Sequence, residues 1–128
     1  FSIKWLIEGS AAVFESMYLK DFEGNYTYAK SAQLRHAKPE DFGPKMEKYE
    51  NREINYGTST AMVLYLCRET GFQRMVDFWK RKPNDENWQR LFEEVFEISV
   101  ERFYAQGRQA ALNELRITDM GDLKKIQF

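Results

Sequence analysis

The sequence predicts an all-α protein, folded as a compact bundle of several helices in a single domain over residues 1–128. Apolar residues recur at the three- and four-residue spacing of a helix through most of the chain. Hydrophobic residues make up 43% and aromatic residues 16% of the 128 residues, which suffices for a core and excludes a disordered chain. Glycine and proline separate the periodic segments from one another.

The first predicted helix covers about Ser2–Lys20, and Gly24-Asn25 prevents its continuation. Residues 22–52 follow an irregular pattern, and a long connection of this kind is often functional. Within it, "KPEDFGP" predicts a short helical turn that begins at Pro39 and stops at Gly43-Pro44. The first helix has its apolar residues at helical spacing, among them Trp5, Leu6, Ala12, Val13 and Met17.

A second strong helix is predicted from about Tyr56 to Thr70. Its centre, "TAMVLYLC", is apolar on all sides, so we expect protein to surround it. Gly71 supplies the left-handed residue that ends this helix. A third helix follows in "FQRMVDFWKR", and Pro83 stops its continuation. The apolar face predicted for the third helix consists of Phe72, Met75, Val76 and Trp79.

The C-terminal part of the chain predicts two further helices with short connections. The fourth covers about Asp85–Glu97, and Ser99 has the side chain of a cap for the fifth. Residues 117–128, "ITDMGDLKKIQF", form a short strand or a last helical turn. The side chains expected to face inward are Trp88, Leu91, Phe92, Val95 and Phe96 in the fourth helix, and Val100, Phe103, Tyr104 and Leu112 in the fifth.

Charge and hydropathy exclude some partners. The 19 basic and 20 acidic side chains are interspersed without a basic stripe, so nucleic acid is not expected as a partner. The longest apolar run, Ala61–Cys67, is far too short to span a bilayer. Cys67 is the only cysteine, so no internal disulfide forms, and the sequence leaves the compartment and the oligomeric state open.

A carboxylate, Glu8, interrupts the apolar start of the first helix and is followed at once by Gly9 and three more small residues. Glu8 either lies on a solvated edge of the helix or is buried, and a buried carboxylate needs a cation, several donors or a metal. Gly9 costs about 1 kcal/mol relative to alanine inside a helix. The run of small residues therefore predicts that another backbone packs very close to this turn.

"WLIEGSAAVFES" resembles the second signature of the gluzincin zinc metallopeptidases, in which Trp-Leu-x-Glu-Gly-x-Ala carries the third zinc ligand. The resemblance implies that Glu8 binds zinc beside two histidines of an upstream His-Glu-x-x-His helix, which leaves one position for water. Glu15 follows Glu8 by two helical turns on the same face. It either accepts a hydrogen bond from a zinc-binding histidine or is a surface acid.

A second segment, "INYGTSTAMVLYLCRETG", resembles the downstream region of the aminopeptidase branch of that family, with Ser59 in place of the more usual glycine. The resemblance implies that the Tyr56 hydroxyl donates to the oxyanion of the tetrahedral intermediate. The alternative is that Tyr56 is a core or rim tyrosine at a helix start. "VFEISVERFYAQGRQ" fits a third family segment loosely, so the resemblance extends from Trp5 to about Gln109.

The chain contains no His-Glu-x-x-His, and its only histidine, His36, is expected to be an exposed loop residue. Because the chain opens in mid-pattern, we expect it to be the C-terminal helical half of a longer zinc metallopeptidase, inactive alone, with zinc bound only in the intact protein. Its partners would then be a peptide or protein substrate and the upstream part of its own chain. Two alternatives are a peptidase-like module that binds without catalysis and an unrelated helical interaction domain.

Overall fold

The computed structural model describes residues 1–18, 37–48 and 52–112. All regular structure in these ranges is helical, which confirms the all-α prediction. The described residues form five α-helices and two short 3-10 turns. In chain order these are α1 (Lys4–Tyr18), η1 (Pro39–Asp41), η2 (Pro44–Glu47), α3 (Arg52–Thr70), α4 (Phe72–Lys80), α5 (Trp88–Phe96) and α6 (Val100–Leu112).

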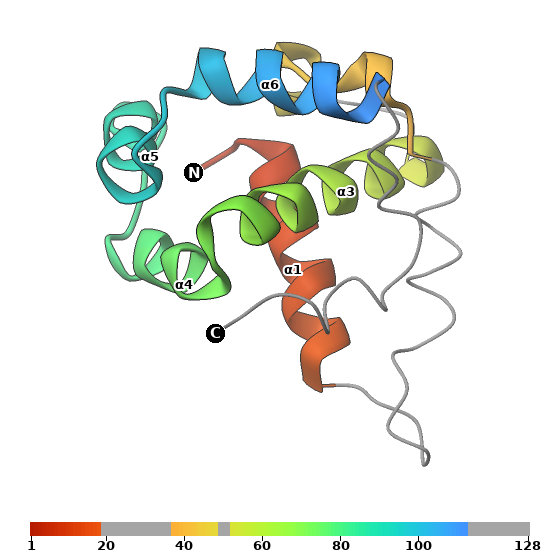
Figure 1. Cartoon of the computed structure of the whole chain (residues 1–128). Helices are drawn as coiled ribbons and strands as arrows, with labels where there is room; N and C mark the ends of the chain where they lie inside the picture. Colours follow the sequence, from red (N-terminus) through yellow and green to blue (C-terminus); the bar gives the residue numbers. More distant parts are fainter. Residues whose placement is uncertain (19–36, 49–51, 113–128) are drawn as a thin grey trace.

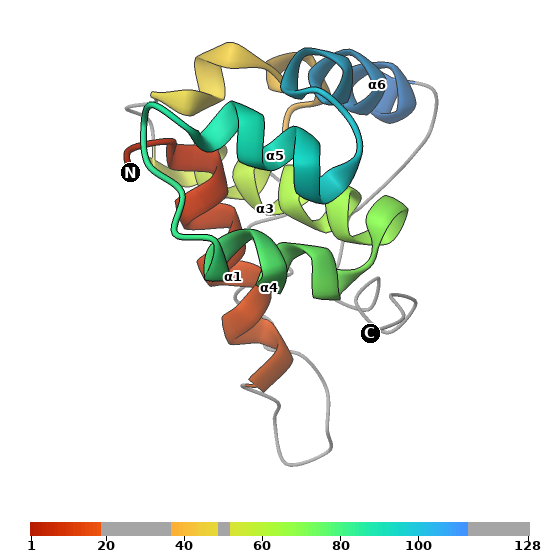
Figure 2. The same ribbon diagram turned by 90° about the vertical axis from the view of Figure 1, so that its left-hand side faces the viewer.

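Helices α1 and α3 cross at the centre of the molecule and make the most extensive contact between any two described elements. Helix α6 runs above this crossing, while α4 and α5 cover the end where α3 finishes (Figure 1). In the rotated view the C-terminal half of α1 extends below the other described helices (Figure 2). The segment just before α1 is tied to the turn before α5, because the backbone N–H and the hydroxyl of Ser2 both donate to Asp85.

Helix α3 begins at Arg52, four residues before the predicted start at Tyr56. Three of the four additional residues are polar and none is a helix breaker, so the helix extends beyond the apolar pattern that predicted it. Its centre is buried from Gly57 to Cys67, as expected for a helix that is apolar on all sides. Gly71, with φ of 96°, ends α3 in a conformation with positive φ that favours glycine.

Helix α4 buries Phe72, Met75 and Phe78, whereas Val76 and Trp79 are only half-buried. The sequence reading therefore missed Phe78, which lies one turn after Met75. Helix α5 begins at Trp88, three residues later than predicted. The delay has a local cause, because the Asn84 side chain accepts from the backbone N–H groups of residues 86 and 87 and holds a turn there.

The cap predicted for the last helix is present, since Ser99 Oγ accepts from the backbone N–H of Arg102 at 3.1 Å. The inward residues predicted for α5 are all buried: Trp88, Leu91, Phe92, Val95 and Phe96. In α6 the predicted residues Val100, Phe103 and Tyr104 are buried as well. The prediction for residues 117–128 lies outside the described part of the chain, as does the one for His36.

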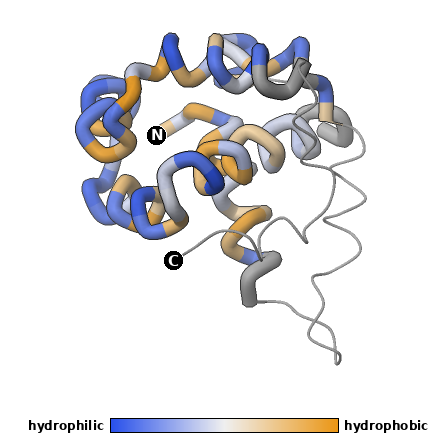
Figure 3. Tube along the Cα trace, in the orientation of Figure 1, coloured by the Kyte–Doolittle hydropathy of each residue, from blue (hydrophilic) through white to orange (hydrophobic). Residues whose placement is uncertain are grey.

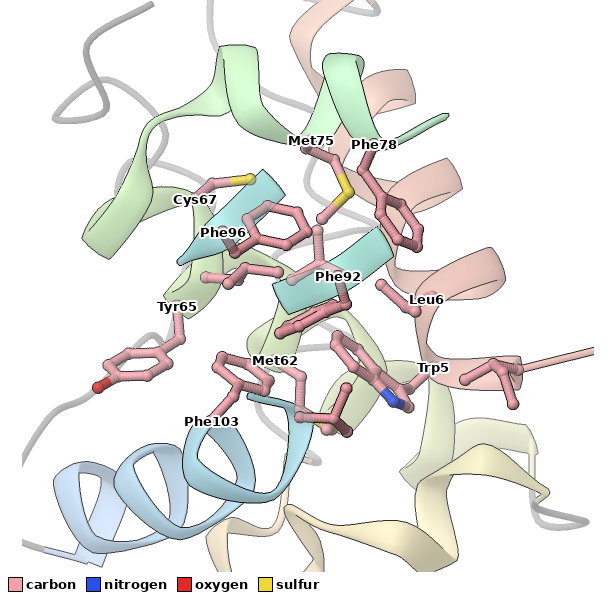
Figure 4. Close-up of a cluster of buried hydrophobic side chains, with 14 of the residues drawn as sticks. Trp5, Leu6, Met62, Tyr65, Cys67, Met75, Phe78, Phe92, Phe96 and Phe103 are labelled. Carbon is pink, nitrogen blue, oxygen red and sulfur yellow. The ribbon is translucent and has the colours of Figure 1, made fainter. Parts of the chain in front are cut away.

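The core is dominated by rings. Hydrophobic and hydrophilic residues alternate along α4 and α5 in the pattern of half-buried helices (Figure 3). Inside, an aromatic cluster fills the space enclosed by α1, α4, α5 and α6 (Figure 4). We define the aromatic cluster as Trp5, Phe78, Phe92, Phe96 and Phe103, whose neighbouring ring centroids lie 4.6–6.3 Å apart.

Residues 37–48, which we call the strap, run between α6 on one side and α1 and α3 on the other. Phe42 and Met46 anchor the strap in the core. The prediction of a helical turn starting at Pro39 is confirmed by η1. Gly43-Pro44 ends that turn, but Pro44 also starts η2, because proline suits the first position of a helical turn.

Candidate functional site

Where α1 and α3 cross, Gly9 of α1 lies directly against the backbone of Ser59 in α3. A Cβ atom placed on Gly9 would overlap the carbonyl oxygen of Ser59 and would lie 2.5 Å from Cγ2 of Val63. Only glycine fits at this position, since a backbone oxygen cannot move aside as a side chain can. The prediction that another backbone packs very close to this turn is confirmed.

Glu8 directly precedes this contact and is half-buried. One side of α1 is buried at Trp5, Gly9 and Val13, and the other is exposed at Lys4 and Ala11. At about 100° per residue, Glu8 falls on the boundary between these two sides. It therefore lies neither on a fully solvated edge nor in the core, and its carboxylate can reach the surface while its stem packs against protein.

Glu15 lies about 20° from Glu8 around the helix axis, two turns further along α1. Its side chain is exposed. The two carboxylates therefore share one edge of α1. This placement is compatible with either of the roles considered for Glu15.

Tyr56 is half-buried in the second turn of α3. Its backbone carbonyl accepts a hydrogen bond from the hydroxyl of Thr60 at 2.8 Å. Tyr56 precedes Ser59 by three residues, so the two residues lie within about 60° of each other around α3. Because Ser59 faces Gly9, the crossing brings the turn that carries Tyr56 toward the turn that carries Glu8.

Two serines at the crossing differ in their hydrogen bonding. Ser10 Oγ accepts from the indole N–H of Trp79 at 3.1 Å and donates to the Met75 sulfur at 3.5 Å, and so joins α1 to α4. Ser59 Oγ is buried, and no residue in the described part of the chain is its hydrogen-bond partner.

The described residues do not make a complete metal site. No group of three or more His, Cys, Asp or Glu side chains that could hold a metal ion occurs in residues 1–18, 37–48 and 52–112. Burial raises the pKa of the Cys67 thiol to about 12, so it remains protonated at neutral pH and is neither a thiolate ligand nor a nucleophile. Glu8 can supply one oxygen ligand, and the remaining ligands of a zinc ion would have to come from outside this set.

One buried hydrogen-bond link was not predicted. The indole N–H of Trp5 donates to the Tyr104 hydroxyl, which in turn contacts Glu47 of the strap. Buried tryptophan and tyrosine usually find polar partners, so the presence of a link could be expected from composition. Its members could not be identified, because Trp5 and Tyr104 lie 99 positions apart in the sequence.

No family model, curated protein or solved structure matches this chain. Among the described residues, none of the helices combines the length and the apolarity needed to cross a bilayer. The fold and the site define a helical bundle in which two helices cross in close contact. One of these helices carries the Glu8 carboxylate and the other carries the Tyr56 phenol.

Proposed function

We propose that this chain is the C-terminal helical half of a zinc-dependent metallopeptidase that hydrolyses peptide bonds in the intact protein. The observation that supports the proposal is the contact between Gly9 and Ser59. The two segments that resemble the gluzincin peptidases are far apart in the sequence, yet each contributes one side of this backbone contact.

In the proposed enzyme, Glu8 provides a carboxylate ligand and the other protein ligands come from a His-Glu-x-x-His segment. Zinc supplies Lewis-acid activation when it is bound. The phenol of Tyr56 donates a hydrogen bond to the oxygen of the attacked carbonyl as negative charge develops there. The close crossing of α1 and α3 keeps these two side chains on a rigid frame.

The first test is to read the native sequence that precedes Phe1. A His-Glu-x-x-His roughly 15 to 30 residues upstream is expected. The full-length protein should then bind zinc and hydrolyse a peptide library. If neither activity nor zinc binding is found, the helical half has a different task, and a peptidase-like binding module becomes the better interpretation.

The second test separates the roles of the two residues in the full-length protein. Glu8→Gln should weaken zinc binding by more than about 100-fold, because it replaces a charged ligand. Glu93→Gln, at an exposed glutamate of α5, is the matched control. Tyr56→Phe should retain zinc but lower kcat about 100- to 1,000-fold, since one oxyanion donor is lost.

Tyr65→Phe controls for the loss of a phenol elsewhere on α3. Equal zinc affinity in Glu8→Gln and in the native protein would remove the proposed metal role of Glu8. An unchanged kcat in Tyr56→Phe would remove the proposed oxyanion donor, even if zinc binding persists.

A further inference from the structure

A chain of two hydrogen bonds runs from the core to the strap through a single hydroxyl. The Trp5 indole N–H can only donate, so the Tyr104 oxygen accepts it, at 2.9 Å. The Tyr104 hydroxyl then donates its own proton to Glu47 Oε2, at 2.8 Å. Burial and the neighbouring Glu47 carboxylate raise the pKa of Tyr104, which keeps this hydroxyl protonated and able to donate.

At one end of these two hydrogen bonds, Trp5 holds the orientation of α1. Trp5 is fully buried, stacks on Phe103 with ring centroids 5.4 Å apart, and precedes Glu8 by three residues. A helix is stiff over one turn, so the rotation of the Trp5 side chain about α1 also sets the direction in which Glu8 projects. Tyr104 therefore acts on α1 through the residue one turn before the proposed ligand.

The other end fixes the strap, which leads into α3. Arg108 of α6 donates to the carbonyl of Phe42 in the middle of the strap. The backbone N–H of Lys38 donates to Thr58 Oγ1 at 3.0 Å, two residues after Tyr56. The strap thus contacts α6 and the second turn of α3, and its half-buried Glu47 is the group that Tyr104 holds.

We infer that Tyr104 is a positioning residue that sets Glu8 on α1 relative to Tyr56 on α3, by joining Trp5 and Glu47 through one buried hydroxyl. The inference rests on the proposed function, because it assigns a role toward the same site. The ring of Tyr104 also packs against Trp5 and Phe103, and a phenylalanine would preserve those contacts. Only the link between α1 and the strap depends on the hydroxyl.

The experiment compares Tyr104→Phe with the native full-length protein in three measurements. Amide hydrogen exchange should increase in residues 37–48 and remain unchanged in α4 and α5. Zinc affinity, measured by competition with a chelator, should fall about 10-fold. On a peptide substrate kcat should fall about 10- to 100-fold with KM nearly constant, because misplacement of catalytic groups affects the transition state most.

Three variants serve as controls. Glu47→Gln keeps an acceptor oxygen and should behave like the native protein, whereas Glu47→Ala should reproduce Tyr104→Phe without a change in the core. Tyr65→Phe removes a phenol for which the described residues provide no hydrogen-bond partner, and it should change none of the three measurements.

The outcomes distinguish the two proposals. If the native protein binds zinc and Tyr104→Phe has native kcat and zinc affinity, the positioning role is wrong and the proposed function stands. If the native protein neither binds zinc nor cleaves peptides, the proposed function is wrong. Hydrogen exchange alone then tests whether the Tyr104 hydroxyl joins α1 to the strap. If residues 37–48 exchange at the same rate in Tyr104→Phe as in the native protein, this role of Tyr104 is wrong.

Discussion

Where α1 crosses α3, backbone meets backbone, whereas the space enclosed by α1, α4, α5 and α6 is filled by large rings. At the crossing, Gly9 and Ser59 leave no room for an added methyl group. In the aromatic cluster, each ring is surrounded by several others in tilted, stacked or edge-to-face arrangements. The first region defines a distance between two helices, and the second fills the core with large apolar side chains.

The difference between backbone contacts and ring contacts indicates which positions tolerate substitution. A cluster of rings can readjust after a conservative substitution, because side chains can repack at moderate cost. A backbone contact cannot readjust unless a whole helix moves. The candidate site residues Glu8 and Tyr56 lie beside the rigid region, as positioning for chemistry would require.

The largest expected effect is in the aromatic cluster. Phe92 is fully buried between the rings of Trp5, Phe78, Phe96 and Phe103. Phe92→Ala removes this ring and leaves a cavity, so the free energy of unfolding should fall by about 3–5 kcal/mol in urea denaturation. Phe92→Leu should cost much less. Similar losses for both variants would show that the cluster does not repack.

A pair of glycine substitutions compares a contact with backbone at the crossing and a contact between α6 and an aromatic ring. Gly9→Ala should lower the free energy of unfolding by about 3 kcal/mol, because the new methyl group meets the backbone of Ser59. Gly107→Ala places its methyl group 3.1 Å from the ring of Phe42, which can turn away, and alanine favours the helix. This second variant should stay within about 1 kcal/mol of the native protein. Equal losses by thermal denaturation would contradict the difference drawn between backbone and ring contacts.

Alkaline pH tests how well the rings exclude water. The Cys67 thiol lies in the apolar core, where burial raises its pKa from 9.0 to about 12. Above pH 9 the unfolded chain releases this proton while the folded chain keeps it, so rising pH favours unfolding. The contribution of the protonated thiol to the free energy of unfolding is fully present below pH 9. This contribution falls by up to about 1.4 kcal/mol per pH unit as pH rises toward 12.

Urea denaturation between pH 9 and pH 10 measures this slope, and Cys67→Ala is the control that should lack it. The raised pKa values of Tyr65 and Tyr104 act in the same direction at higher pH. If the free energy of unfolding of Cys67→Ala falls with pH as steeply as that of the native protein, a group other than Cys67 causes the pH dependence.

The smallest effects come from two buried serines of the crossing and should have opposite signs. Ser10→Ala removes the acceptor of the Trp79 indole N–H and should cost about 1 kcal/mol. Ser59→Ala removes a buried hydroxyl that has no partner among the described residues, so the variant should be as stable as the native protein or up to about 1 kcal/mol more stable. Calorimetry of both variants measures the difference, and a loss at Ser59 would reveal a partner that the packing does not show.

The helical elements were largely predictable, and the errors have local causes. Apolar periodicity located every described α-helix, but it placed the start of α3 four residues late, because the first turn of that helix is mostly polar. It placed the start of α5 three residues early, because the hydrogen bonds of the Asn84 side chain favour a turn. The small residues after Glu8 correctly predicted a close backbone, although the sequence could not identify Ser59 as its partner.

The sequence by itself determined the all-α class, most of the core residues and the small residues at which another backbone packs close. These features depend on local periodicity and on short patterns, which a single chain displays directly. The tertiary structure alone decided that Gly9 meets Ser59 and that Tyr104 joins Trp5 to Glu47. Such pairs lie tens of residues apart, and which faces meet depends on how the whole set of helices packs, a property that no local pattern contains.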